Sequence, residues 1–256
     1  TGWQEFLLAK FDEAEKHFRK ALDKDPKHVP AHVGLAHLNL DRDPAAAARA
    51  ARAGLDAAPR SGRAGYALAV AELRQGKDAQ SFDHAWLATR DPATAVAGRA
   101  LVAKLLLRRS SWSHVIQTLT EPGPWRTDPV CRNRLACAFL RVGQANAARE
   151  LAEQNLRDDP LDAFALHLVA LSRAGAKDPR PTVPSMLSPE ATLELVADYF
   201  ALGQLDWARD VALQTPELRG SLGPHSPARG HPLLLYWVAY LNASGGPGLP
   251  SVGLQP

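Results

Sequence analysis

The sequence lacks most features that mark an enzyme, a metal site or a membrane segment. It has two cysteines and no Cys-x-x-Cys motif, no His-Glu-x-x-His motif, and no glycine-rich phosphate loop. The longest apolar run near the C-terminus, residues 233–241, is about half the roughly 20 residues that a membrane helix needs. Its 30 basic and 27 acidic residues nearly balance, which disfavours nucleic acid and membranes as partners. We therefore expect no catalytic residue, no metal and no cofactor in this segment.

The scarce sulfur-containing residues fit that expectation. Cys131 and Cys137 lie six residues apart on one expected helix, so their Cα atoms should be roughly 9 Å apart, beyond disulfide reach. We interpret both as small buried side chains and expect a cytoplasmic location.

The only methionine is Met186 and the sequence begins at Thr1, so we interpret the chain as a segment of a longer protein. The nine histidines show no converging set of three or four ligands, and we expect exposed or capping roles for them.

What the sequence does have is a regular spacing of prolines. Pro26, Pro59 and Pro92 follow one another at intervals of 33, and Pro160 comes 68 residues later, which is two further steps. A period of this length is typical of arrays of helix–turn–helix units, in which each unit buries its apolar face against its neighbours. No alternating apolar pattern competes, and helix-forming alanine, leucine and arginine dominate. We predict an all-α array of about six to seven degenerate units.

The residue pattern within a unit resembles the tetratricopeptide (TPR) repeat. In that family a large residue, an alanine, an aromatic, a second alanine and a proline recur along the second helix. The first unit has this pattern at Phe11, Ala14, Phe18, Ala21 and Pro26. The resemblance implies a right-handed superhelix of antiparallel helix pairs.

The predicted units differ in quality along the chain. They lie near 1–26, 29–59, 62–92, 93–126 and 128–160, with the start of a sixth at 161–175. The best formed is 128–160, in which Gly143 separates the two helices and Ala148 and Ala152 stripe the second. We interpret 176–187 as a proline-rich insertion, 188–243 as a further helix pair with a closing helix, and 244–256 as a disordered tail.

The order of these parts also resembles the TPR tail of certain large bacterial proteins. Those proteins carry a β-sandwich domain of uncertain activity before the repeats. The resemblance rests on the weak middle unit, the proline-rich insertion and the closing helix that begins at His231. It implies a second possible role, as a structural or oligomerising tail of a larger enzyme, including one that acts on carbohydrate.

Three arginines repeat with the array. Arg74, Arg108 and Arg141 are 34 and 33 residues apart, and each closes the first helix of its unit. In TPR proteins the first helices line a peptide groove, so we predict that these arginines contact an acidic or C-terminal carboxylate peptide. The simpler alternative is a solvated cation that the helix dipole favours. By register, the groove would also include His37, Tyr66 and Asn133. The lysines of a true carboxylate clamp are missing.

The function predicted from the sequence is therefore a non-catalytic scaffold. We expect a protein or peptide partner, of acidic character, in the groove of the first helices, with self-association as a further possibility. The alternative remains the tail of a larger bacterial enzyme.

Overall fold

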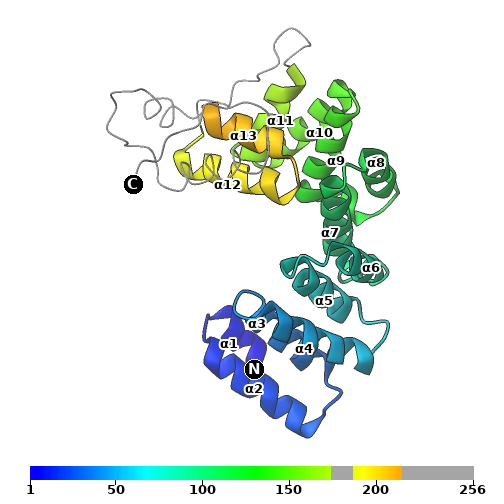
Figure 1. Ribbon diagram of the computed structural model, residues 1–256, viewed down its shortest axis with the longest axis vertical. Helices are drawn as coiled ribbons and strands as arrows, with labels where there is room; N and C mark the ends of the chain where they lie inside the picture. Colours follow the sequence, from blue (N-terminus) through cyan, green and yellow to red (C-terminus); the bar gives the residue numbers. More distant parts are fainter. Residues whose placement is uncertain (174–186, 215–256) are drawn as a thin grey trace. The chain divides into compact units, whose positions relative to one another are not determined.

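The structure is a computed structural model that describes residues 1–173 and 187–214 (Figure 1). All regular structure in these two ranges is helical, which confirms the all-α prediction. Three predictions lie outside the described residues: the closing helix near 231–241, the disordered tail at 244–256, and the insertion at 176–187 except its last residue.

The chain divides into two compact units. Unit 1 comprises Thr1–Leu105 with Glu121–Cys131, and unit 2 comprises residues 106–120 with the described residues from Arg132 on. Unit 1 contains α1 (Gly2–Leu7), α2 (Phe11–Lys24), α3 (Val29–Asn39), α4 (Pro44–Ala57), α5 (Gly62–Arg74), α6 (Asp78–Ala88), most of α7 (Ala95–Arg108) and the 3₁₀ helix η1 (Pro124–Thr127). Unit 2 contains α8 (Trp112–Thr120), most of α9 (Pro129–Arg141), α10 (Ala145–Asp158), α11 (Ala163–Arg173), α12 (Pro189–Ala201) and α13 (Leu205–Gln214).

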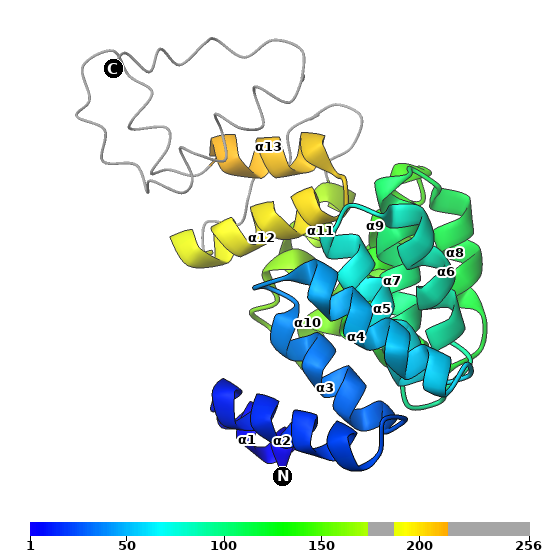
Figure 2. The ribbon, with the colours of Figure 1, turned by 60° about the horizontal axis from the view of Figure 1, so that its bottom comes forward.

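Consecutive helices pack against each other within each unit. In unit 1, α1 packs on α2, α3 on α4 and α5 on α6, and the first helix α3 also contacts both α1 and α5 (Figure 2). In unit 2, α10 packs on α11 and α12 on α13. We call α1, α3, α5, α7, α9, α11 and α12 first helices, and their partners second helices.

Small residues allow the helices to pack closely. Ala14, Ala47 and Ala51 in unit 1 are fully buried, as are Ala148 and Ala152 in unit 2. An alanine side chain ends at its Cβ atom, so neighbouring helix backbones can approach closely at these positions.

The ring of Phe18 fills the space above two glycines. A Cβ atom at Gly34 would lie 2.4 Å from the ring, and one at Gly2 would lie 2.8 Å from it. The aromatic position of the repeat therefore depends on glycines in the two neighbouring first helices.

A residue with a left-handed backbone conformation lies two positions after the end of several first helices. Gly76, Gly143 and Gly203 have φ values of 72°, 79° and 72°, and they follow α5, α9 and α12. Ala9 after α1 and Ser110 after α7 occupy the same place with φ values of 57° and 54°. This conformation turns the chain into the second helix, and only glycine adopts it without steric cost.

Aspartate and serine side chains begin several helices. Asp43 accepts a hydrogen bond from the N–H of Ala46 (2.9 Å), and Asp128 accepts one from Cys131 (2.8 Å). Ser188 caps α12 in the same way. Each of the three precedes a proline at the first helical position, so an N-cap side chain followed by proline is a recurrent helix start in this chain.

Both cysteines are buried free thiols on α9, as the sequence predicts. Burial raises the pKa of the Cys137 thiol, so this group stays protonated.

An arginine lies between two tryptophans in unit 1. The guanidinium of Arg99 on α7 lies 4.4 Å from the ring centre of Trp125 and 5.0 Å from that of Trp86. It forms an ion pair with Glu121 at 2.7 Å, and only 11% of its side chain is exposed. Cation–π and ionic contacts together therefore fix the segment around η1 against α6 and α7.

Candidate interaction surfaces

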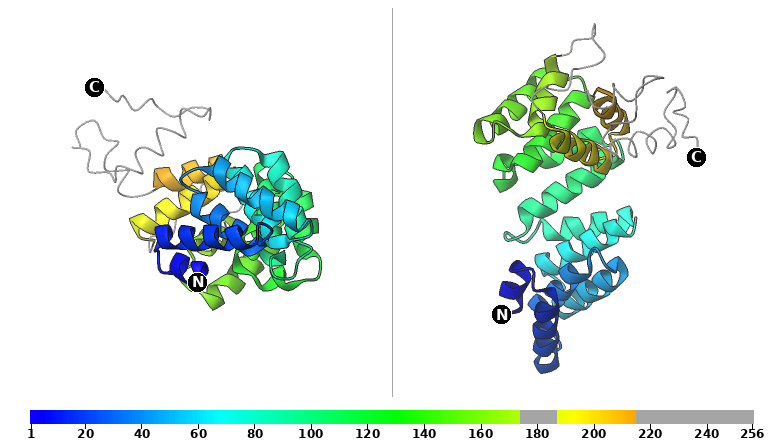
Figure 3. Two further views of the ribbon diagram at one scale, coloured as in Figure 1. Left: turned by 90° about the horizontal axis from the view of Figure 1, so that it is seen from below. Right: turned by 90° about the vertical axis from the view of Figure 1, so that its left-hand side faces the viewer.

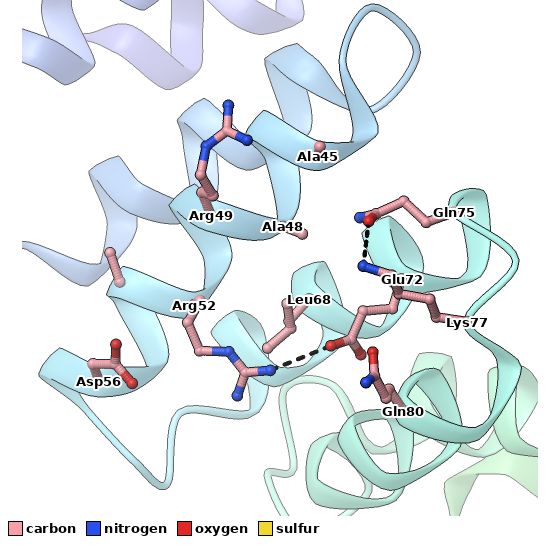
Figure 4. Close-up of a pocket in the computed structure, with 11 residues that line it drawn as sticks. Ala45, Ala48, Arg49, Arg52, Asp56, Leu68, Glu72, Gln75, Lys77 and Gln80 are labelled. Atoms are coloured by element: carbon pink, nitrogen blue, oxygen red, sulfur yellow. Dashed lines mark hydrogen bonds and ion pairs between the residues drawn. The ribbon is translucent and has the colours of Figure 1, made fainter.

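An open groove of about 470 Å³ lies in unit 1 between the second helices α4 and α6 (Figure 4). We call it the α4–α6 groove. Its lining residues are Ala45, Ala48, Arg49, Arg52, Ala53, Asp56, Leu68, Glu72, Gln75, Lys77 and Gln80. The three alanines of α4 leave room along one wall, and Leu68 and Glu72 of α5 form the floor. A groove of this volume can hold several side chains of a bound segment.

The rim of the α4–α6 groove carries mainly positive charge. The cationic residues that line the groove are Arg49, Arg52 and Lys77. Of the two carboxylates that line it, Asp56 and Glu72, only Asp56 is exposed. The Arg49 guanidinium lies 3.7 Å from the Asp43 carboxylate, and both side chains are exposed. This ion pair therefore offsets little of the positive charge of Arg49. The groove therefore offers an exposed cationic rim to a ligand.

The negative charge of the second carboxylate in the groove, Glu72, is offset by the side chains bonded to it. Only 4% of its side chain is exposed. It accepts hydrogen bonds from His84 (2.6 Å) and Arg52 (3.3 Å), and an Arg52 N–H also donates to Nε2 of His84 at 3.3 Å. Arginine can only donate, so Nε2 of His84 accepts and Nδ1 carries the proton that bonds Glu72. This network joins α4, α5 and α6 and sets the width of the groove.

One end of the groove is closed by Gln75. Its amide donates to the carbonyl of Pro44 at 2.9 Å, which ties the end of α5 to the start of α4. Its amide oxygen accepts from the ammonium of Lys77 at 2.7 Å. This places the Lys77 charge at the closed end.

In unit 2 the pair α12–α13, which we call the hairpin, lies against first helices (Figure 3). Tyr199 of α12 is fully buried, with its ring centre 4.7 Å from that of Phe164 and 5.4 Å from that of His167, both on α11. Its hydroxyl shares a hydrogen bond of 2.8 Å with Nδ1 of His167. Burial raises the pKa of Tyr199 well above its usual value, and the nearby Cys137 of α9 adds to this. Tyr199 therefore anchors the hairpin between α9 and α11.

Arg141 fastens the other end of the hairpin. Its guanidinium donates to both carboxylate oxygens of Asp206, at 2.7 Å and 2.5 Å, and its Nε donates to Gln204 at 2.8 Å. The same guanidinium lies 3.8 Å from the ring centre of Trp207 and 5.7 Å from that of Trp112. Burial alone would raise the pKa of Asp206, but the bonds and charge of Arg141 outweigh it and lower that pKa.

The groove residues predicted in unit 1 lie on first helices, outside the α4–α6 groove. His37 packs against the rings of Trp3 and Phe6, and burial lowers its pKa. Tyr66 is half-buried on α5. Arg74 forms an exposed ion pair with Asp41 at 3.2 Å. Their predicted role in peptide binding stays a prediction.

The groove residues predicted in unit 2 are engaged in different ways. Arg141 holds the hairpin, as described above. Asn133 donates to Asp162 at 3.0 Å and accepts from Asn155 at 2.7 Å, which links α9, α10 and α11. Arg108 is exposed at the end of α7. Their role as peptide contacts also stays a prediction.

Two absences concern residues 1–173 and 187–214 alone. There, no three histidine, cysteine, aspartate or glutamate side chains come together as metal ligands. Within the same ranges, no helix has the length and hydropathy to cross a membrane.

Known proteins resemble this chain in structure. No family model and no curated protein matches its sequence. PilW, a widely conserved type IV pilus biogenesis factor, is 16% identical, and the match covers 87% of this chain and 95% of PilW with a TM-score of 0.58. PilF of Pseudomonas aeruginosa is also 16% identical over 95% of this chain and 94% of its own, with a TM-score of 0.57.

A thermophilic TPR protein of Thermus thermophilus is 18% identical, over 66% of this chain and 94% of its own, with a TM-score of 0.52. At these identities the likeness concerns the fold. The described part of this chain therefore has the fold of a tetratricopeptide-repeat protein, as the resemblance in the sequence implies.

Proposed function

We propose that this chain is a non-catalytic scaffold that binds an acidic segment of another protein in the α4–α6 groove. The observation that carries the proposal is the open groove itself, with room along the alanines of α4 and the exposed cations Arg49 and Lys77 at its rim. Helical-repeat proteins present extended surfaces to other proteins, so the fold supports this class of function.

The chemistry of the groove favours a carboxylate-bearing ligand. Glu72 is already bonded by Arg52 and His84, so it adds little negative charge at the opening. Aspartate or glutamate side chains of a partner would meet Arg49 and Lys77, while small apolar side chains would pack on Ala45 and Ala48. The α4–α6 groove is proposed in addition to the predicted first-helix contacts of unit 1, and a cytoplasmic location remains part of the proposal.

A labelled acidic peptide tests the proposal by fluorescence anisotropy with the full chain. The groove variant carries Arg49→Glu and Lys77→Glu, and the matched control carries Lys24→Glu and Arg63→Glu, which are exposed and do not line the groove. Both double variants change the net charge equally. We expect the groove variant to bind roughly tenfold more weakly and the control to bind almost normally.

A charge-neutral variant separates shape from charge. Ala45→Trp places a large ring in the groove from an exposed position, so the fold should tolerate it while the peptide is excluded. Equal loss of binding in the groove variant and the control, with no effect of Ala45→Trp, would mean that the peptide responds only to overall charge.

A second role has one observation in its favour. Leu7 and Leu8 are 81% and 68% exposed, and Phe11 beside them is also exposed. Such an apolar edge suits a surface that packs on another domain or a second copy, as the tail of a larger enzyme would. Light scattering of the full chain and of a Leu7→Glu, Leu8→Glu variant tests it: the tail role predicts an oligomer that the variant dissociates.

A further inference from the structure

Helix α12 has three carboxylates and neither lysine nor arginine, a combination that no other helix within residues 1–173 and 187–214 has. Its inner face is buried against neighbouring helices and includes Leu195 and Tyr199. The three carboxylates lie on the opposite face and are exposed: Glu190, Glu194 and Asp198. Residues four apart on a helix are neighbours, so these side chains form one line of negative charge along α12.

Two small residues complete this outer face of α12. Ala197 is exposed and Ala201 is half-buried, and both lie in line with the carboxylates. We call the whole set the acidic stripe, and its members are Glu190, Glu194, Ala197, Asp198 and Ala201. Alanines among carboxylates allow a second helix to approach closely while the charges remain available at its sides. This is the ligand chemistry that suits the α4–α6 groove.

The groove side of α4 has the same spacing as the acidic stripe and mainly the opposite charge. In both helices the positions follow at steps of four, three, one and three residues. In α4 they are Ala45, Arg49, Arg52, Ala53 and Asp56, all of which line the groove. Lys77 adds a further cation at the end where α4 begins, because Gln75 bonds both Lys77 and the Pro44 carbonyl.

We propose that the α4–α6 groove of one copy of this chain binds the acidic stripe of a second copy. This contact rests on the function proposed for the groove, and it names the source of the acidic segment. The groove is open in the structure, and the acidic stripe is the outer face of α12. Binding therefore leaves the contacts of Tyr199 and Arg141 within unit 2 as they are.

Charge sets the direction in which α12 lies along α4. In the parallel direction each carboxylate of the acidic stripe meets a cation. The resulting neighbours are Glu190 with Lys77, Glu194 with Arg49, Asp198 with Arg52, and Ala201 with Asp56. The antiparallel direction would place Glu190 beside Asp56, and like charges in contact disfavour it.

Every copy carries both halves of this contact, so association needs no other protein. One helix in one groove is a small interface, and we expect a dissociation constant on the order of 10 µM or weaker. Because the contact is largely ionic and near the surface, it should weaken as the salt concentration rises.

Sedimentation equilibrium of the full chain at low salt tests the contact over a wide range of concentration. The average mass of the unchanged chain should rise above that of one chain as concentration increases. Ala45→Trp fills the groove, and Glu194→Arg with Ala197→Arg reverses the acidic stripe. We expect each change to weaken association at least about tenfold.

A matched control and a mixture make the test specific. Gln117→Arg with Glu150→Arg adds the same charge at exposed positions of α8 and α10, and it should associate as the unchanged chain does. The groove variant keeps its acidic stripe, and the stripe variant keeps its groove. An equimolar mixture of the two should therefore form a one-to-one complex, which also verifies that both variants are folded.

A chain that stays monomeric at all concentrations overturns the contact. If the labelled acidic peptide still binds the groove of that monomer, the function proposed for the groove stands with a different partner, whereas absence of both kinds of binding rejects the two together. The contact is also overturned if the mixture remains monomeric, or if association is lost only in the Leu7→Glu, Leu8→Glu variant. Equal weakening in the stripe variant and its charge control would likewise contradict it.

Discussion

The two units each hold an arginine between two tryptophans and against a carboxylate, but they use it differently. In unit 1, Arg99 stacks on Trp86 and Trp125 and pairs with Glu121, all from elements close in sequence. It is a local brace, and the groove between α4 and α6 in the same unit stays open.

In unit 2, Arg141 stacks on Trp112 and Trp207 and pairs with Asp206, which lies 65 residues further along the chain. There the same chemistry fastens a distant helix pair onto a surface of first helices. The comparison teaches that one side-chain arrangement can either brace elements that are close in sequence or fasten a distant helix pair to its unit. The predictions that follow test this difference between the units.

The largest expected effect is at the anchor of the hairpin. Tyr199→Ala removes a fully buried aromatic ring, and we expect a loss of about 3–5 kcal/mol in unfolding free energy. Phe18→Ala in unit 1 should cost a similar amount, since its ring is 4% exposed and fills the space above two glycines. Urea denaturation measures both losses, and hydrogen exchange should locate the first in α11–α13 and the second in α1–α3. Overlapping exchange patterns would contradict the division into units.

The next effect is on the pH dependence of unit 2. Burial lowers the pKa of His167 to about 4, and its Nε2 has no hydrogen-bond partner among the described residues. The unfolded chain takes up this proton near pH 6.5 and the folded chain does not, so stability is full above that pH and is lost as pH falls toward 4. The full loss is roughly 3 kcal/mol. Urea titrations at several pH values check this.

His167→Gln should remove most of that pH dependence. A smaller part should remain, because burial also lowers the pKa of His37 in unit 1, and it acts in the same direction. An unchanged slope in the His167→Gln variant would show that other groups cause the acid sensitivity.

A smaller effect concerns the open groove of unit 1. Asp56→Lys removes the exposed carboxylate of the rim, and we expect the acidic peptide to bind with about 1 kcal/mol more favourable free energy. Asp23→Lys, on the exposed face of α2, changes the charge equally outside the groove and should have little effect. Calorimetric titration compares the two, and equal gains would speak against the groove.

The smallest effect is at the turns that both units share. Ser110→Gly relieves a left-handed φ of 54°, and we expect it to stabilise unit 2 by about 0.5 kcal/mol after the entropy of glycine is deducted. Ala9→Gly should act similarly in unit 1, and Gly143→Ser should have the opposite sign. Shifts of the urea midpoint measure all three, and a loss of stability in Ser110→Gly would contradict the turn assignment.

The sequence predicts the helices well because their signals are local. Buried alanines, capping aspartates and the glycines 76, 143 and 203 all act within a few residues, so spacing alone identifies them. The turns at Ala9 and Ser110 are not predictable in this way, because neither residue signals a left-handed conformation.

The candidate sites are harder to predict because they depend on contacts across the fold. The repeat register placed Arg141 on a first helix but could not identify Asp206 as its partner. The α4–α6 groove lies between second helices, whereas the family resemblance predicts a groove on first helices. Its signal is present in α4, where Arg49, Arg52 and Asp56 recur at steps of three and four among alanines, which places them on one exposed face.

Hydrogen exchange of the full chain tests the contrast between the two arginines most directly. Arg141→Ala should speed exchange at the amides of α12 and α13 by at least about tenfold and leave α9 and α10 protected, because it releases the hairpin alone. Arg99→Ala should leave α12 and α13 unchanged and act near α6, α7 and η1. Equal exchange at α12 and α13 in the two variants, or no change in Arg141→Ala, would contradict the conclusion that Arg141 fastens the hairpin to unit 2.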